Sequence, residues 1–290
     1  MKPFHLALAV LVAAIWGVGF VAIQIGLESF PPIFFTALRS AVASLPFILF
    51  FPRPKVAWKW LIAMGFSLGV LLTGLLYVGM DLGMPAGLSS LVLQAQAFFT
   101  VLLAAALLSE RPTARQIIGM AIAFSGIGLI AVTRETGGGL LALGLVVAAA
   151  FFWGVFNILI KQVRAPDMLR LMVWVSVVPP LPLLALSWVM EGPARITYSL
   201  ANLSWPGVWA LLYLAVLATI VATSLWGFLF RHYPASQVAP FSLLVPVFGM
   251  SSAAVVFGES LSVLEVAGSV MVAVGLIVIN MKKRRAAETP

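Results

Sequence analysis

The chain has 290 residues, of which 62% are hydrophobic and only 9% are charged, and it contains no cysteine. About a quarter of the residues of a soluble domain are charged, so this composition excludes a soluble domain. It indicates an all-α integral membrane protein. The absence of cysteine excludes disulfides, thiol catalysis and thiolate metal sites. The net charge of +8 does not predict nucleic-acid binding, because the basic residues lie in short connections between apolar segments.

Apolar segments follow one another along the whole chain. A helix of ~20 apolar residues crosses ~30 Å of hydrocarbon, so each segment predicts a transmembrane helix. The first one resembles a signal peptide, but it is too long and recurs in the second half of the chain. The longest polar break, 191–205, is expected to lie along the membrane interface. The ten predicted helices cover roughly 4–27, 31–51, 60–82, 85–108, 115–133, 139–161, 168–190, 206–230, 234–257 and 262–281.

The distribution of basic residues predicts the orientation. An even number of crossings places both termini on one side of the membrane. Fourteen Lys or Arg residues fall on that side, and only Arg134 and Arg195 fall on the other. The positive-inside rule therefore predicts that both termini are cytoplasmic. The fourteen are Lys2, Arg53, Lys55, Lys59, Arg111, Arg115, Lys161, Arg164, Arg170, Arg231, Lys282, Lys283, Arg284 and Arg285.

The chain contains an internal repeat. A shift of 149 residues superposes 85–110 on 234–259, and a shift of 137 superposes Trp16 on Trp153. The second half therefore holds about twelve extra residues, which we place at 191–205. The two predicted halves are 1–136 and 137–290. Each half has five helices, and because five is odd the second half enters from the opposite face. Inverted repeats around a central cavity are characteristic of secondary transporters.

The repeat also includes a helix start. Thr113 and Gln116 form the pattern of a capping box, and Ser262 and Glu265 form the same pattern 149 residues later. In each pair the hydroxyl is expected to accept a backbone N–H of the following helix, and the longer side chain to reach back to the cap residue.

The first helix of each half carries an aromatic and polar stripe. Trp16, Phe20 and Gln24 are spaced four residues apart and share one helix face, and Trp153 and Asn157 follow the same spacing. Polar groups in mid-membrane usually face a bundle interior or water, so these residues are candidates for a substrate cavity. The alternative is that the two tryptophans pack helices or belong to an interfacial belt.

A second stripe lies on the third helix of each half. Tyr77 and Asp81 share a face, and Trp226 occupies the position equivalent to Tyr77. Aromatic ring faces attract ammonium groups, which suits the wall of a cavity for an amine. Ordinary aromatic packing is the alternative for either ring. Asp81 is a possible ionic residue of the site, although its place near a helix end also fits a solvated carboxylate.

The fourth helix carries Gln94 and Gln96. On a helix they point about 200° apart, so they cannot share a face. Gln96 lies with Thr100 on a polar stripe, and we expect it to face the cavity. Gln94 lies with small residues, and we expect an interhelical hydrogen bond there. We keep both as candidate cavity residues.

Two further positions have a functional and a structural interpretation. Pro246 interrupts the ninth predicted helix, and a carbonyl released there could accept from a substrate ammonium; a packing kink is the alternative. Arg39 is the only basic residue well inside a segment. It is a possible anchor for a carboxylate, or a structural arginine that reaches the interface or bonds to carbonyls. Prolines 179, 180 and 182 are expected to interrupt the seventh helix.

Specific stretches of the chain resemble a known family. These are MPAGLSSLVLQAQAFFT, RPKV, YLAVLATIVA and VAPFSLLVPV, together with the Trp-Gly pair in each half. They are similar to the EamA-like group of the drug/metabolite transporter superfamily. The resemblance implies a monomeric, multi-pass exporter in the bacterial inner membrane. Its substrates would be neutral amino acids and related metabolites, including aromatic or cysteine- and O-acetylserine-like ones, and a proton or an exchanged solute could be coupled to export.

Other functions fit the sequence less well. No metal cluster, nucleophile–base pair or phosphate-binding loop is present, so we predict neither an enzyme nor a cofactor. The partners expected are small amino acids and the lipid bilayer, with no nucleic acid. A broader drug or metabolite efflux carrier is the main alternative. A nucleotide-sugar or phosphate-ester carrier would need several fixed cations in the membrane, and a channel would show a ring of charge or a carbonyl filter.

Overall fold

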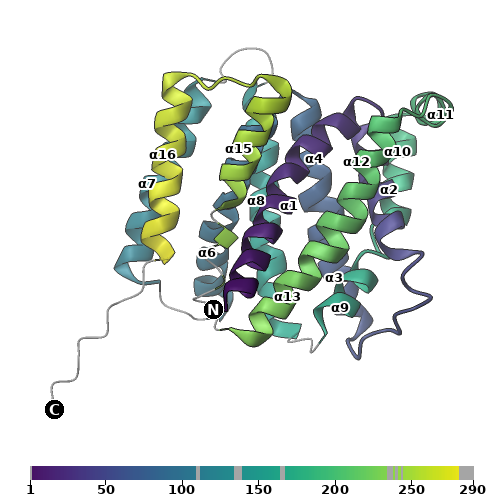
Figure 1. Ribbon diagram of the computed structural model, residues 1–290, viewed down its shortest axis with the longest axis horizontal. Coiled ribbons are helices and arrows are strands. Elements are labelled where there is room, and N and C mark those ends of the chain that lie inside the picture. Colours follow the sequence, from purple (N-terminus) through teal and green to yellow (C-terminus); the bar gives the residue numbers. More distant parts are fainter. Residues whose placement is uncertain are drawn as a thin grey trace.

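The computed structural model describes residues 2–108, 112–133, 139–163, 167–233, 238, 241–242 and 244–280. These residues form helices and no strand. Most helices run side by side, and the start of α1 and the end of α16 lie on the same side of the bundle (Figure 1). The all-α prediction is confirmed. The helices of the first half are α1 (Pro3–Leu27), α2 (Pro32–Ser44), α3 (Trp58–Gly65), η1 (Phe66–Leu72), α4 (Thr73–Asp81), α5 (Ala86–Val92), η2 (Leu93–Ala95), α6 (Gln96–Leu108) and α7 (Ala114–Val132).

The second half of the chain has a short added helix, α11, within the polar break 191–205. Figure 1 shows the added helix α11 end-on, across the direction of the long helices, as expected for the polar break. The helices here are α8 (Gly139–Val163), α9 (Met168–Val175), α10 (Pro180–Met190), α11 (Pro193–Ala201), α12 (Trp205–Leu212), η3 (Tyr213–Val221), α13 (Ala222–His232), α15 (Leu244–Phe257) and α16 (Val263–Asn280).

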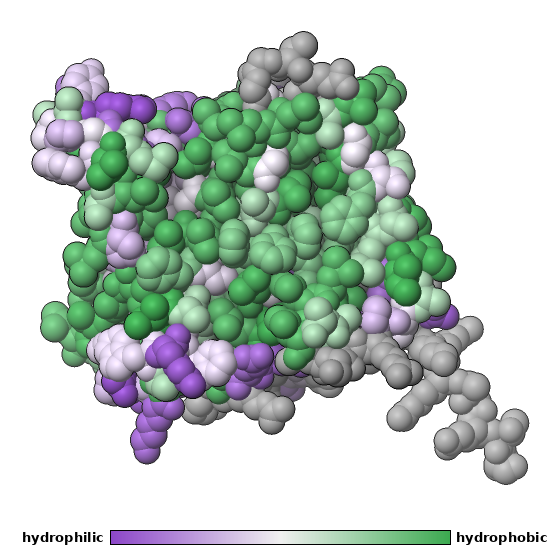
Figure 2. All heavy atoms as spheres, turned by 180° about the vertical axis from the view of Figure 1, so that it is seen from behind, coloured by the Kyte–Doolittle hydropathy of each residue, from purple (hydrophilic) through white to green (hydrophobic). Residues whose placement is uncertain are grey.

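The surface is that of a membrane protein. Figure 2 shows an apolar band across the molecule, with hydrophilic side chains along one edge and at the corner where α11 lies. Seven helical stretches of the described chain are long and apolar enough to cross a membrane, and two shorter apolar helices, Leu244–Phe257 and Val263–Val278, follow them. The seven are Pro3–Leu27, Trp58–Asp81, Ala86–Leu107, Ala114–Val132, Gly139–Val163, Met168–Met190 and Trp205–Leu229.

Several of these stretches are not regular α-helices. The stretch Trp58–Asp81 contains the π-helix η1, and the stretch Trp205–Leu229 contains the π-helix η3. A shift of 149 carries 66–72 onto 215–221. The helical stretch from Met168 breaks between α9 and α10, where Pro179 and Pro180 were expected to interrupt it. A π-helix leaves a carbonyl or side chain displaced from the regular ladder, and such segments are frequent at functional sites.

The two predicted capping boxes are both present. At the start of α7, Gln116 N donates to Thr113 Oγ1 at 3.3 Å and Thr113 N donates to Gln116 Oε1 at 2.8 Å. Before α16, Glu265 N donates to Ser262 Oγ at 3.3 Å and Ser262 N donates to Glu265 Oε2 at 2.8 Å. Each box therefore supplies partners to a helix start that the bilayer cannot supply.

Glycines that the repeat places in register pack against one another. A Cβ on Gly126 of α7 would lie 2.6 Å from the carbonyl oxygen of Gly268 of α16. A Cβ on Gly275 would lie 2.5 Å from the carbonyl oxygen of Gly119. Only glycine allows the two backbones to approach this closely, as at other small-residue interfaces in membranes.

Two carboxylates on one side of the bundle bind the N-termini of helices far away in the chain. Glu191 accepts from the backbone N–H of Ile33 (2.7 Å) and Phe34 (3.0 Å) at the start of α2. Glu259 accepts from Ala86 (2.9 Å) and Gly87 (3.0 Å) at the start of α5. We call these contacts the Glu191 clamp and the Glu259 clamp. Each joins the second half of the chain to the first, and each carboxylate lies at the positive end of a helix dipole.

Pro246 lies in α15 and is buried. Residue 243, directly before the described part of this helix, is outside the described residues, so the release of a carbonyl by Pro246 stays a prediction. Pro240, a second proline of the same predicted helix, also lies outside the described residues.

Removing a clamp should destabilise the fold. We expect Glu259→Ala and Glu191→Ala each to lower the free energy of unfolding by about 1.5–3 kcal/mol, because each deletes charge-assisted hydrogen bonds to N–H groups that have no other partner. Glu28→Ala is the matched control, since Glu28 is an exposed carboxylate and accepts no hydrogen bond from the described residues. Thermal unfolding in detergent measures the change. Equal stability of all three variants would contradict a structural role for the clamps.

Candidate functional site

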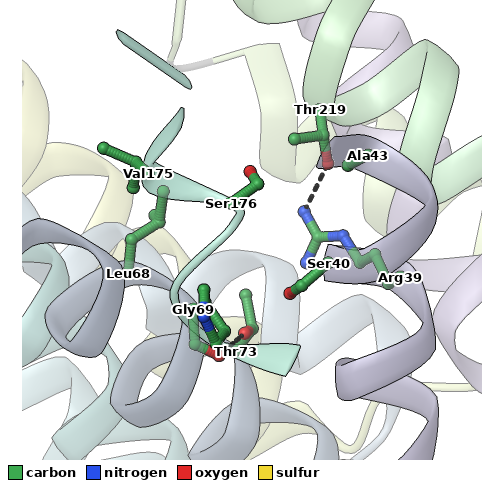
Figure 3. A pocket seen from close by; sticks show the side chains of 10 residues that line it. Arg39, Ser40, Ala43, Leu68, Gly69, Thr73, Val175, Ser176 and Thr219 are labelled. Atoms are coloured by element: carbon green, nitrogen blue, oxygen red, sulfur yellow. Dashed lines mark hydrogen bonds between the residues drawn. The ribbon is translucent and has the colours of Figure 1, made fainter. Parts of the chain in front are cut away.

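A small cavity lies against Arg39 on α2 (Figure 3). Its volume is about 30 Å³, and we call it the Arg39 cavity. The guanidinium of Arg39 donates to the hydroxyl of Thr219 at 3.0 Å and to that of Tyr77 at 3.3 Å. No carboxylate of the described chain forms an ion pair with it. The residues that line the cavity are Arg39, Ser40, Ala43, Leu68, Gly69, Thr73, Val175, Ser176, Pro179 and Thr219.

Hydroxyl groups from four different elements surround this guanidinium. Ser40 Oγ donates to the carbonyl one turn earlier at 3.0 Å, and Thr73 Oγ1 does the same on α4. Thr219 Oγ1 donates to a carbonyl five residues earlier at 2.7 Å, the spacing that a π-helix creates. These three protons are used within their own helices, so the hydroxyl oxygens present lone pairs to the cavity. Ser176 is 7% exposed, and its hydroxyl bonds to no described residue.

A second polar cluster lies between α6 and α8. Asn157 Nδ2 donates to Gln96 Oε1 at 2.7 Å and to Thr100 Oγ1 at 3.0 Å. It borders a cavity of about 160 Å³, the Asn157 cavity, which extends to Gln116 and Lys161 at the side of the bundle where α1 starts. The structure thus brings together Asn157 and Gln96, which sequence analysis placed on separate stripes.

An aromatic pair connects the two halves of the chain. The ring centroids of Trp16 on α1 and Trp226 on α13 are 5.3 Å apart in an edge-on arrangement. Trp16 Nε1 donates to the carbonyl of Ala218 at 3.0 Å, inside the π-helix η3. The hydroxyl of Tyr213, at the start of η3, donates in turn to the carbonyl of Ile15 at 2.9 Å. Trp16 is therefore held by its own hydrogen bond and borders irregular backbone.

The remaining candidate residues, Phe20, Trp153, Gln24 and Gln94, do not line either cavity. Phe20 is 5% exposed and belongs to the main hydrophobic core, against which Trp153 packs. Gln24 is half-buried and bonds to no described residue. Gln94 is 3% exposed in the 3-10 turn η2. The hydrogen bond expected from Gln94 is absent among the described residues.

Tyr77 and Asp81, predicted on one stripe, have different environments. Tyr77 is fully buried, bonds to Arg39 and packs on Phe35 at a centroid distance of 5.3 Å. Asp81 is exposed at the end of α4 and lies within electrostatic range of Arg195 on α11. Asp81 lines neither cavity, which matches the interpretation of a solvated carboxylate.

Sequence reasoning missed Ser176 and Thr219. One signal for Ser176 was present, because the shift of 137 that superposes Trp16 on Trp153 also superposes Arg39 on Ser176. Thr219 gave no signal, since a lone threonine in an apolar helix usually bonds to its own backbone. Within the described residues, no three His, Asp or Glu side chains lie close enough to hold a metal ion.

Comparisons with known proteins agree on one family. The model of the EamA-like transporter family matches residues 4–132 and again 140–281. A "Probable amino-acid metabolite efflux pump" of Salmonella typhimurium (strain LT2) is 40% identical over 97% of this chain and 96% of its own length. A protein of the same description from Escherichia coli (strain K12) is 38% identical over 93% of both chains.

Two more distant similarities extend over nearly the whole chain. A "Probable terminal-alkyne amino-acid exporter" of Streptantibioticus cattleyicolor is 28% identical over 97% of this chain and 96% of its own. A solved crystal structure superposes with a TM-score of 0.63 at 17% identity, over 98% of this chain and 100% of that one. At such identity the superposition bears on the fold alone.

The Asn157–Gln96 hydrogen bond should show up as a coupling energy. Buried side-chain hydrogen bonds in membrane proteins average about 0.6 kcal/mol in double-mutant cycles, with a maximum near 1.7 kcal/mol. We expect Asn157→Ala and Gln96→Ala to be coupled by an amount in this range, measured by unfolding in mixed micelles. Asn157→Ala combined with Gln162→Ala, an exposed amide on the same helix, should be additive. Additivity in both cycles would show that the bond is not made.

Proposed function

Because the chain belongs to the EamA-like transporter family, whose members are transporters and not enzymes, we propose that it exports amino acids and related metabolites by alternating access. The observation that carries the proposal is the similarity, over nearly the full length of both chains, to two amino-acid metabolite efflux pumps. The cavities agree with this function in their chemistry. They combine a single guanidinium, several hydroxyls and an amide cluster within an apolar bundle.

The proposed architecture has ten transmembrane helices in two inverted repeats, 1–136 and 137–290. Two matches of the same family model, one in each half, support this division. The repeated π-helices and the glycine contacts between α7 and α16 also support it. In this arrangement the Arg39 cavity lies between the repeats, since α2 and η1 come from one half and α9 and η3 from the other.

The proposed location is the bacterial inner membrane, with both termini in the cytoplasm. The excess of Lys and Arg on one side supports this orientation. The Glu191 and Glu259 clamps then lie on the periplasmic side, together with the hydroxyl contact between Ser29 and Ser204 at 2.6 Å. The Asn157 cavity lies on the cytoplasmic side. The described conformation is thus held closed toward the periplasm.

The walls fit a neutral zwitterion better than a multiply charged anion. Arg39 and Lys161 are single cations in separate cavities, whereas a phosphate ester needs several cations around one group. Trp16, Gln96 and Asn157 can meet a neutral solute through ring faces and amide dipoles. We propose that the protein works as a monomer on small amino acids, and that export is coupled to a proton or an exchanged solute.

Cysteine labelling tests the orientation. The native chain has no cysteine, so a single introduced thiol reports one position. Ala194→Cys on α11 should react with an impermeant maleimide in intact cells, because α11 is exposed on the proposed periplasmic side. Lys55→Cys, exposed in the connection before α3, should react only after the cells are opened. The reverse pattern would contradict the proposed topology.

Competition in proteoliposomes tests the substrate class. A mostly apolar site discriminates one methylene by only ~1–3 kcal/mol, so several neutral amino acids, including aromatic ones, should compete for uptake of one another. Sugar phosphates and dicarboxylates at the same concentration should not compete. Empty liposomes and a pH gradient imposed on each sample serve as controls. Effective competition by sugar phosphates would favour the phosphate-ester carrier instead.

A further inference from the structure

Arg39 is a half-buried cation inside a membrane bundle, without a counter-ion in the described chain. A guanidinium has five N–H donors, and the structure assigns two bonds, both to neutral hydroxyls. Charged side chains inside a membrane are normally paired with one another or with backbone carbonyls. Arg39 bonds to no carbonyl of the described residues, which argues against a purely structural arginine. Its remaining donors face the Arg39 cavity (Figure 3).

Irregular backbone segments converge on this one cavity. Gly69 belongs to the π-helix η1, Thr219 belongs to the π-helix η3, and Ser176 and Pro179 belong to the break between α9 and α10. A Cβ on Gly69 would lie 2.0 Å from Pro179 Cγ, so the first irregular segment rests directly on the break. Discontinuous helices form the substrate sites of many secondary transporters, because backbone groups outside the regular ladder are available there.

The polar groups around the cavity have complementary roles. Arg39 offers only donors, whereas the hydroxyls of Ser40, Thr73 and Thr219 have already donated their protons to helix carbonyls. Those three oxygens can therefore accept, and the Ser176 hydroxyl adds a buried group without a described partner. Donors for an anion thus lie beside acceptors for a cation. An α-amino acid presents this pair of charges two bonds apart.

We propose that Arg39 binds the carboxylate of the transported amino acid, and that the surrounding hydroxyls, Ser176 among them, accept from its ammonium group. This inference rests on the proposed export of amino acids and adds the residues that recognise them. The substrate carboxylate supplies the counter-ion that the chain does not. Recognition of the shared backbone groups leaves the side chain of the substrate to the apolar and aromatic walls.

The size of the cavity sets a condition on binding. A volume of about 30 Å³ accommodates one or two water-sized groups and not a whole amino acid. Binding of a whole amino acid therefore requires the walls of the cavity to move apart.

A ligand series on the wild-type chain tests the proposal without any variant. Leucine and phenylalanine, the two amides leucinamide and phenylalaninamide, and 4-methylpentanoate differ only in carboxylate, ammonium and side chain. We expect the amides and 4-methylpentanoate to compete for tritiated leucine or phenylalanine about 10–100-fold more weakly than the amino acids, as for the loss of one charged hydrogen-bonded contact. The full-length protein in nanodiscs is used. Amides that bind as tightly as the amino acids would overturn the carboxylate site.

Variants then assign the contact to residues. Arg39→Gln should weaken the binding of leucine about 10–100-fold and leave the binding of leucinamide unchanged. Arg39→Lys should recover part of the lost affinity, because lysine keeps the positive charge but not the bidentate geometry of the guanidinium. Ser176→Ala should weaken the binding of leucine and of leucinamide by the same factor. It should leave the binding of 4-methylpentanoate unchanged, because this ligand has no ammonium group. Arg195→Gln on α11 is the control and should change nothing. Size-exclusion profiles and melting temperatures are recorded for each variant.

The outcomes separate this inference from the proposed function. If the wild type transports neutral amino acids but Arg39→Gln binds acid and amide with unchanged preference, the Arg39 site is wrong and amino-acid export stands. If the wild type neither binds nor transports a neutral amino acid, export itself is wrong. If Arg39→Gln does not fold, the ligand series on the wild type and the Ser176→Ala variant test the proposed contacts to the carboxylate and the ammonium.

Discussion

The hydrocarbon core of a bilayer offers no hydrogen-bond partner, so every polar group placed there has to be satisfied by another part of the chain. This constraint explains most of the polar contacts in the structure. Asn157 bonds to Gln96 and Thr100, and the hydroxyls of Ser40 and Thr73 bond within their own helices. Arg39 is the exception, because among the described residues its full positive charge meets two hydroxyls and the ring of Tyr77 and no carboxylate. This half-buried charge is therefore the group for which we propose an external ligand.

The internal repeat is visible in the structure as contacts and as distortions. Gly126 packs on Gly268 and Gly119 on Gly275, each in the helix that follows a capping box. The π-helices η1 and η3 lie at equivalent positions, 149 residues apart in the sequence. Both border the Arg39 cavity. The repeat is not symmetric in chemistry, however, since the shift pairs Arg39 with Ser176. A pseudo-symmetric site with a charged residue, Arg39, at one position and a neutral residue, Ser176, at the equivalent position can bind a ligand whose two ends differ.

Much of the fold could be predicted from the sequence, because hydrophobic length, capping patterns and proline positions are local signals. The helical class, both capping boxes and the break before Pro180 were predicted correctly. The clamps could not be, because Glu191 and Ile33 are 158 residues apart and nothing local pairs them. For the same reason the hydroxyls around Arg39, which come from four elements, appear only when the helices are packed.

The positions of the clamps and of the irregular segments constrain how the proposed cycle can work. The clamps join the two halves at one end of the bundle, so opening that end exchanges charge-assisted hydrogen bonds for contacts with water, which solvates both partners well. Such contacts lock a closed state and still allow it to open. The irregular segments around Arg39 lie nearer the middle, where backbone bending disturbs few regular hydrogen bonds. In the proposed cycle the two halves move relative to each other, and a bound carboxylate would neutralise the charge of Arg39 between them. A neutral pair in a low-dielectric region resists such motion less than an unpaired charge does. The protein with bound substrate would then change conformation more easily than the empty protein. A carrier needs this difference in order to exchange solutes.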